Sequence, residues 1–185
     1  EKANQVFKKI FSNVENPVNK IKTTISKIFP DYKISGIREN QRNYALCTIR
    51  RHENGKSIPL HKDNVSYEGV EYEVSKINTQ LSCILHLQET EKGGNLSIYN
   101  KRWKKKLEKY REIEFGYNSN IKKKSLSDTI ETKLGDLVII NPNYLHEVKE
   151  IQGISDRVTL GMFFGIENKT KKILFWAWYS SKYSK

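Results

Sequence analysis

The sequence predicts a mainly β fold with helices at its N-terminus, an α+β class in which helices back a β-sandwich or barrel. Two observations carry this prediction. Apolar residues recur at helical spacing through residues 4–29, and short β-rich runs separated by Gly, Asn and Pro follow from Ile34 onward. The chain has 185 residues, of which 37% are hydrophobic, so we expect a single domain with a core of its own.

Two helices are expected within residues 1–30, where they would support the β-rich part. Asn16 suits an N-cap and Pro17 the first helical position, so the second helix should begin there and end before Pro30. The apolar positions are Val6, Phe7, Ile10, Phe11 and Val14 in the first helix and Val18, Ile21, Ile25 and Ile28 in the second.

The β-rich part spans residues 34–180 and is expected to contain about eight strands. Its clearest runs are Tyr44–Arg51, Tyr72–Ile77, Leu81–Leu87, Leu96–Tyr99, Leu137–Ile140, Val158–Phe164 and Ile173–Tyr179. Alternating or continuous apolar character in short runs is typical of strands that face a core.

One charged segment, residues 101–124, interrupts the strands. Trp103, Leu107 and Tyr110 stand at i, i+4 and i+7, which predicts a short amphipathic helix followed by a loop at Gly116–Asn120. Two interpretations stay open: a surface excursion packed by Trp103, or a lid that closes over a small ligand. We treat the segment as a candidate lid insertion.

Composition narrows the classes of partner. The net charge is +12, but 26 of the 33 cationic residues are Lys, so these charges favour solvated faces over nucleic-acid recognition, for which Arg is better suited. The longest apolar run has seven residues, against the ~20 that cross a bilayer, so no membrane partner is expected. The N-terminus shows no secretory signal and only two cysteines occur, so we expect a reducing cytoplasm.

Three residues form a candidate metal site. His61 and Asp63 are two positions apart on extended chain, which directs both side chains to one face, and His146 follows a buried strand and a turn. Two imidazoles and one carboxylate make the facial triad of non-haem Fe(II) oxygenases. The alternative is a surface His–Asp pair and a separate core histidine, because a lone His-x-Asp is weak evidence.

Arg157 and Thr159 strengthen the metal hypothesis. They share one face of a buried strand, and a buried cation without a nearby acid in sequence needs an anionic partner. A dicarboxylate cosubstrate could supply it, chelating the metal at one end and meeting Arg157 and the Thr159 hydroxyl at the other.

With these residues in place, the sequence resembles the Fe(II)/2-oxoglutarate-dependent oxygenases, in particular the prolyl-4-hydroxylase-like branch. The resemblance covers about residues 44–165. Its motifs, in family order, are Asn54-Gly55, His61-Lys62-Asp63-Asn64, Gly93-Gly94-Asn95-Leu96, Gly135-Asp136-Leu137, His146-Glu147-Val148 and Arg157-Val158-Thr159. It implies a double-stranded β-helix, a jelly-roll or cupin-like core, over residues 34–180.

The resemblance also implies site residues and cofactors. His61, Asp63 and His146 would bind iron, and Arg157 and Thr159 would bind 2-oxoglutarate. Fe(II), 2-oxoglutarate and O₂ would be required, with ascorbate as a stimulating reductant. Three further candidates depart from the family pattern or lie near the site: His86 as a cosubstrate contact, and Arg51 and Trp103 as substrate contacts.

The expected activity is hydroxylation of an unactivated C–H bond in a small molecule, such as a free amino acid or natural-product intermediate, as in bacterial members of the family. Related halogenases lack the carboxylate ligand, so Asp63 favours oxygenation. Three alternatives remain: a peptidyl prolyl hydroxylase, a nucleic-acid demethylase, disfavoured because Phe163 stands where that group has a second Arg, and a non-catalytic β-barrel binding protein. The sequence leaves the substrate and the oligomeric state open.

Overall fold

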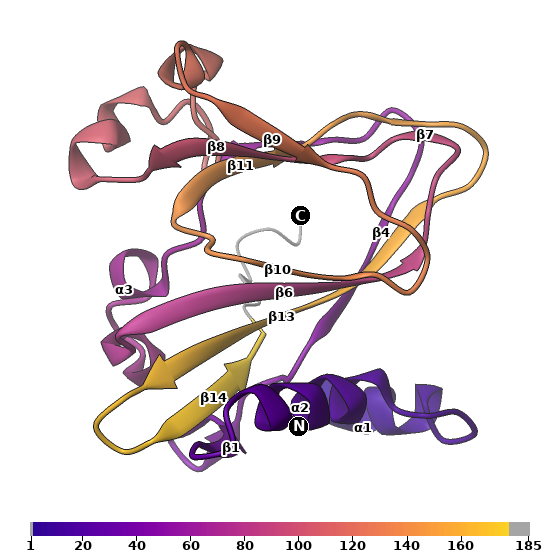
Figure 1. The fold of residues 1–185 in the computed structure, drawn as a ribbon, viewed down its shortest axis with the longest axis vertical. Helices are drawn as coiled ribbons and strands as arrows, with labels where there is room; N and C mark the ends of the chain where they lie inside the picture. Colours follow the sequence, from indigo (N-terminus) through magenta and orange to yellow (C-terminus); the bar gives the residue numbers. More distant parts are fainter. Residues whose placement is uncertain (1, 178–185) are drawn as a thin grey trace. The chain divides into compact units, whose positions relative to one another are not determined.

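The computed structural model describes residues 2–177 (Figure 1). The chain divides into two compact units, which are described separately. Unit 1 falls within Glu1–Thr48, Val65–Cys83 and Gly161–Lys185, and unit 2 within Ile49–Asn64 and Ile84–Leu160. Strands β6 (Thr79–Gln88) and β13 (Arg157–Glu167) pass through both. Among the described helices, none has the length and apolar character that a bilayer crossing requires.

Unit 1 contains the two expected helices, which are confirmed as α1 (Lys2–Ile10) and α2 (Pro17–Ile28). The Asn16 side chain accepts a 2.9 Å hydrogen bond from the Val18 amide, and Pro17 opens the helix, as the sequence predicts. Helix α2 buries its apolar stripe at Val18, Ile21 and Ile25, whereas the stripe of α1 stays largely exposed.

The strands of unit 1 follow the helices. Strand β1 (Lys33–Gly36) pairs in parallel with β14 (Lys172–Trp176), which pairs antiparallel with β13. Shorter elements complete the unit: β2 (Arg38–Glu39), β3 (Arg42–Asn43), α3 (Val65–Glu68) and η1 (Glu73–Lys76). A core of Ile37, Val65, Val74, Phe163 and Trp176 lies between these elements. Residues 178 and 179 of the expected last strand lie outside the described residues.

The strand expected at Tyr72–Ile77 is wrong. This run forms the 3₁₀ helix η1, because its amides bond locally: Ser75 donates to the Tyr72 carbonyl at 3.0 Å and Ile77 to that of Val74 at 3.3 Å. Only Val74 of the run is deeply buried. The residues at Tyr72–Ile77 favour a strand, but without a neighbouring strand to pair with they form a turn of 3₁₀ helix.

Unit 2 contains a four-stranded sheet in the order β5 (Ile58–His61), β11 (Tyr144–Val148), β8 (Leu96–Arg102) and β9 (Ser127–Ile130), and Figure 1 shows β8, β9 and β11 together. Four further strands belong to it: β4 (Thr48–His52), β10 (Leu137–Ile140), β7 (Lys92–Gly93) and β12 (Ile151–Gln152), the last two of which pair with each other. The expected strands at residues 81–87, 96–99, 137–140 and 158–164 are confirmed.

The helix expected in residues 101–124 differs in type. Lys105–Tyr110 forms a 3₁₀ helix, η2, and Ser119–Lys122 a second one, η3. At three residues per turn, the i, i+4, i+7 pattern no longer makes one face. Accordingly Leu107 is buried, while Tyr110 is 39% exposed and Trp103 precedes the helix.

Candidate metal centre

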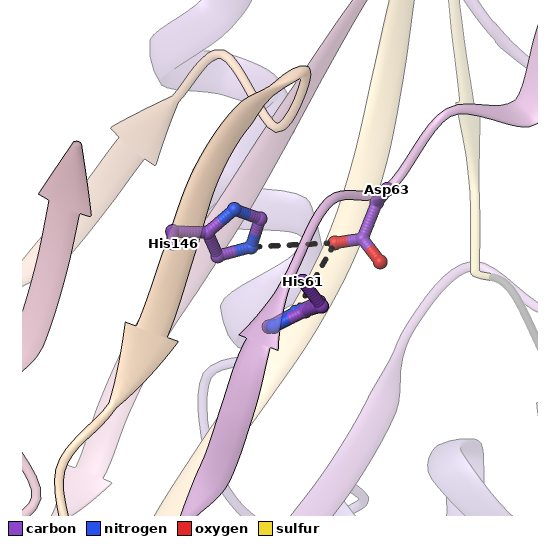
Figure 2. Close-up of side chains that lie close together, drawn as sticks. All are labelled: His61, Asp63 and His146. Carbon is purple, nitrogen blue, oxygen red and sulfur yellow. Dashed lines mark ion pairs between the residues drawn. The ribbon is translucent and has the colours of Figure 1, made fainter. Parts of the chain in front are cut away.

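Two adjacent antiparallel strands place the histidines of the site. His61 ends β5 and is the register partner of His146 on β11, so the two side chains leave neighbouring strands at the same level. Asp63 follows two residues after His61, where its amide donates a 2.9 Å hydrogen bond to the Pro142 carbonyl. Figure 2 shows the three side chains pointing toward one another.

The distances fit a single ion. The Nε2 atoms of His146 and His61 lie 3.7 and 4.0 Å from Asp63 Oδ2, and the ligand atoms of all three residues lie within 4.8 Å of one another. In each histidine, Nδ1 lies 2.8 Å from a backbone carbonyl, that of Pro59 for His61 and that of Tyr144 for His146. A carbonyl only accepts, so Nδ1 carries a proton in each ring, and in a neutral imidazole Nε2 then offers its lone pair to a metal.

Electrostatics set the protonation states that a metal needs. Burial, together with the neighbouring His146, lowers the pKa of His61 to about 4. Burial alone would raise the pKa of Asp63, but the adjacent His146 and His61 rings and the Arg50 charge outweigh it and lower the pKa. At neutral pH the site thus offers a neutral His61 and an ionised Asp63, which fits Fe(II) with nitrogen and carboxylate ligands.

Arg50 on β4 is a residue that the sequence analysis did not single out. Its charge acts on both His61 and Asp63. Arg51, the expected substrate contact, is instead 64% exposed and pairs with Asp156 and, at 3.5 Å, with Glu53. Since alternate residues of a strand face opposite ways, the β4 register could have shown that Arg50 and His52 share a face that Arg51 does not.

A second polar group, the Arg157 cluster, consists of Arg157, His86, Glu89 and His52. Arg157 is 3% exposed, and its Nε has no hydrogen-bond partner among the described residues. His86 on β6 is also buried; its Nδ1 contacts the Glu89 carboxylate and its Nε2 is unpartnered within the described part of the chain. Nδ1 of His52 is likewise buried without a hydrogen-bond partner among the described residues. Burial and the Arg157 charge lower the pKa of His52.

Gly94, two residues before β8, makes room for Arg157. Gly94 has a φ of +69°, and a Cβ there would lie 3.0 Å from Cδ of Arg157.

Burial lowers the pKa of Arg157, and the Glu89 charge only partly offsets this. Thr159, buried two residues farther along β13, is on the same face as Arg157. A buried guanidinium with an unused N–H donor can form a charge-assisted hydrogen bond with an anion.

Trp103, the other expected substrate contact, lies at the base of the 101–124 segment. Its Nε1 donates a 2.7 Å hydrogen bond to Glu108, and Nζ of the buried Lys62 lies 4.7 Å from its ring centroid. These contacts tie Trp103 to neighbouring protein groups. The structure therefore supports an anchoring role for Trp103.

Comparison with known proteins agrees with this centre. The family model for the carrier-protein-independent halogenase WelO5 matches residues 1–177. The chain belongs to the WelO5-like halogenase family. This family depends on iron and 2-oxoglutarate, so the resemblance to Fe(II)/2-oxoglutarate oxygenases seen in the sequence is confirmed.

Individual relatives come from natural-product and amino-acid chemistry. Leucinostatins biosynthesis cluster protein S of Purpureocillium lilacinum is 27% identical over 155 residues, which cover 80% of this chain and 63% of that protein. Two crystal structures of an N-substituted L-amino acid dioxygenase from Burkholderia ambifaria AMMD, one in complex with alpha-KG, are similar with a TM-score of 0.59 each.

The two structures are 19% and 17% identical to this chain and match 80% and 86% of it, so the likeness concerns the fold. This chain covers 58% and 72% of their lengths. It thus spans less than two thirds of the fungal relative and of the alpha-KG complex.

Proposed function

We propose that this chain is an Fe(II)- and 2-oxoglutarate-dependent oxygenase built on a double-stranded β-helix. The observation that carries the proposal is the triad: His61, Asp63 and His146 converge on one point, with each Nδ1 held by a backbone carbonyl and the carboxylate ionised. Two nitrogens and one carboxylate oxygen leave three positions open on an octahedral ion. The family match supports the same cofactors.

The bound iron would supply O₂ activation, coupled to decarboxylation of 2-oxoglutarate to succinate and CO₂. The protein's residues have separate roles around it. His61, Asp63 and His146 hold the ion, while Pro59 and Tyr144 fix the imidazole tautomers through their carbonyls. Arg157 receives the far carboxylate of the cosubstrate, with Thr159 beside it on β13.

Two residues next to the triad favour a small substrate with an anionic group and an apolar part. Arg50 places a positive charge near Asp63 and His61. The Phe115 ring meets the His61 ring edge to face, with centroids 6.4 Å apart. A free or substituted amino acid, or a natural-product intermediate bearing a carboxylate, would match both groups. The relatives' natural-product and amino-acid chemistry supports this class.

Asp63 decides between oxygenation and halogenation in our proposal. The family is named for a halogenase, and a halide would need the coordination position that a carboxylate fills. Because Asp63 lies 3.7 and 4.0 Å from the two histidine Nε2 atoms, it is placed as the third protein ligand. We therefore propose hydroxylation, or another oxidation, with halogenation as the second candidate.

The test is a screen of free and N-substituted amino acids with Fe(II), 2-oxoglutarate, O₂ and chloride, read by succinate formation and mass spectrometry. We expect a substrate-dependent gain of one oxygen in the wild type. Asp63→Gly should lose that product and open a position where chloride can bind. A chlorinated product from the wild type would refute oxygenation, and absence of any 2-oxoglutarate turnover across iron-loaded preparations would refute the cofactor assignment.

Other sequence expectations stay predictions. These concern stimulation by ascorbate, a cytoplasmic location and a small-molecule rather than peptide substrate. The peptide alternative makes the same use of the triad and Arg157, so the same screen with proline-containing peptides separates the two. The buried free thiols of Cys47 and Cys83 are compatible with a reducing setting.

A further inference from the structure

The Arg157 cluster contains a histidine whose two ring nitrogens have different surroundings. Nδ1 of His86 contacts a carboxylate oxygen of Glu89, whereas Nε2 is buried and unpartnered among the described residues. Since an ionised carboxylate only accepts, the Glu89 contact places a proton on Nδ1. In neutral His86, Nε2 is then an acceptor with no donor facing it.

A carboxylate cannot bind to such an atom unless the atom gains a proton. Both Nε2 and a carboxylate oxygen offer only lone pairs, and their contact in a buried site would be repulsive. Protonation of Nε2 converts the pair into a charge-assisted hydrogen bond, and Glu89 stabilises the imidazolium from the other side. Arg157, whose charge acts on His86, has a buried Nε donor without a partner among the described residues.

We propose that His86 and Arg157 together bind the far carboxylate of 2-oxoglutarate, and that His86 takes up one proton from solvent at Nε2 when the ligand binds. The inference rests on the proposed function, because it assumes that 2-oxoglutarate is the ligand. It assigns carboxylate binding to His86 and a positioning role to Glu89, both of which lie outside the metal centre. In this step one proton and one dicarboxylate bind to the protein, and no other covalent bond is made or broken.

The charges around His86 allow this change. Burial lowers the pKa of His86 and the Arg157 charge lowers it as well, while Glu89 and Asp136 act in the opposite direction. Asp136 precedes β10, and its carbonyl accepts a 3.0 Å hydrogen bond from the His86 amide. A bound carboxylate would offset the Arg157 charge and raise the pKa of His86. Between the lower pKa of the free site and the higher one of the complex, binding takes up a proton, so affinity weakens as the pH rises through that window.

His52 provides a matched control. His52 is a half-buried histidine whose pKa the Arg157 charge lowers, and like His86 it has one unpartnered ring nitrogen among the described residues. Unlike His86, it has no contact with a carboxylate in that part of the chain. Without such a partner, an imidazolium at His52 beside Arg157 is unfavourable. We therefore assign the proton to His86 and not to His52.

The experiment is calorimetric titration of 2-oxoglutarate into the Fe(II)-loaded protein without O₂, near neutral pH, in buffers with different ionisation enthalpies. Both carboxylates of the ligand are ionised at that pH, so the buffer dependence counts protons taken up by the protein. We expect about one proton per ligand in the wild type and in His52→Gln. In His86→Gln the uptake should vanish, and the Kd should rise about tenfold through loss of one charge-assisted hydrogen bond.

Glu89→Gln keeps a hydrogen-bond partner for Nδ1 but removes the charge, so the uptake should fall and the pH dependence of the Kd should shift to lower pH. This variant carries the test if His86→Gln does not fold, as judged by circular dichroism. Binding by the wild type without proton uptake, uptake retained in His86→Gln, or uptake lost in His52→Gln would each overturn the assignment. Iron-loaded wild type that does not bind 2-oxoglutarate would instead refute the proposed function.

Discussion

Replacing Arg157 by Met should separate its functional role from a structural one. The substitution keeps most of the apolar stem and removes the guanidinium, which is 3% exposed and has an unused Nε donor in the described part of the chain. Each hydrogen bond to a charged group contributes ~1.5 to 3 kcal/mol, so losing the contact to the far carboxylate should raise the 2-oxoglutarate Kd ~10- to 100-fold. Iron binding should be unchanged, because the triad keeps all three ligands.

The same substitution should not destabilise the ligand-free protein. The desolvation cost of this buried cation is only partly offset by the Glu89 charge, so removing the guanidinium is neutral or stabilising. A gain of about 1 kcal/mol corresponds to a rise of ~2 to 4 °C in Tm for a chain of this size. Function and stability thus move in opposite directions, a combination that loss of a structural cation would not give.

The assay combines two measurements on the same preparations: the 2-oxoglutarate Kd with Fe(II) bound and O₂ excluded, and the Tm without ligand. Arg51→Met is the matched control, since Arg51 is exposed and pairs on the surface with Asp156 and Glu53. Surface pairs contribute ~0 to 1 kcal/mol, so its Kd should not change. If Arg157→Met lowers the Tm and leaves the Kd as in the wild type, Arg157 is a structural cation and the cosubstrate is anchored elsewhere.

Three further predictions follow from the site and its supports. His61→Ala and His146→Ala should each lose bound iron, measured by metal analysis, with unchanged circular dichroism, and normal iron content in either would contradict the triad. Gly94→Ala should raise the 2-oxoglutarate Kd, because its Cβ would press on Cδ of Arg157 from 3.0 Å at a positive φ, whereas Gly55→Ala, at a similar φ with open space around it, should not. Glu147→Gln should lower the Tm by several degrees at neutral pH, because it removes the charge that pairs with Lys122 and leaves one acceptor oxygen for Lys122 and Tyr99. Burial would raise the pKa of Glu147, but Lys122, Lys149 and Tyr99 lower it to about 2; the Tm difference should therefore shrink as the pH falls from ~4.5 toward that value, and a pH-independent difference would contradict this account.

The metal ligands could be predicted from sequence because their signals are local. His61 and Asp63 share a face by strand periodicity, and His146 follows a buried strand, as in the family that the sequence resembles. The register of β5 against β11, which brings His61 opposite His146, is a tertiary fact that the motif spacing only implied. The orientation of each ring also depends on the carbonyls of Pro59 and Tyr144, which no residue pattern announces.

Two kinds of question depend on the folded chain. In a strand one residue reverses the direction of the side chain, so Arg50 and Arg51 face opposite ways, and the role of Arg51 as a substrate contact stays a prediction. The run at Tyr72–Ile77 and the segment at Trp103–Tyr110 failed for a related reason: composition and period fix a preference, but the available hydrogen-bond partners decide the element. Both became 3₁₀ helices whose amides bond within the segment.

The position of the 101–124 segment limits what part of it can act as a lid. Leu60 and Leu145, each next to a metal ligand in sequence, pack with Tyr99, Tyr117 and Ile121 in one core cluster. The Tyr117 amide also donates a 2.8 Å hydrogen bond to the Leu60 carbonyl.

The end of this segment is therefore fixed to the strands that carry His61 and His146, and displacing it would expose the apolar backs of those strands. A turn lies between Arg111 and Tyr117, which form a bridge across it. Phe115 in that turn lies against the His61 ring. Any closing motion of this segment that spares the core contacts would therefore involve the residues around Phe115, whose ring borders that of the metal ligand His61.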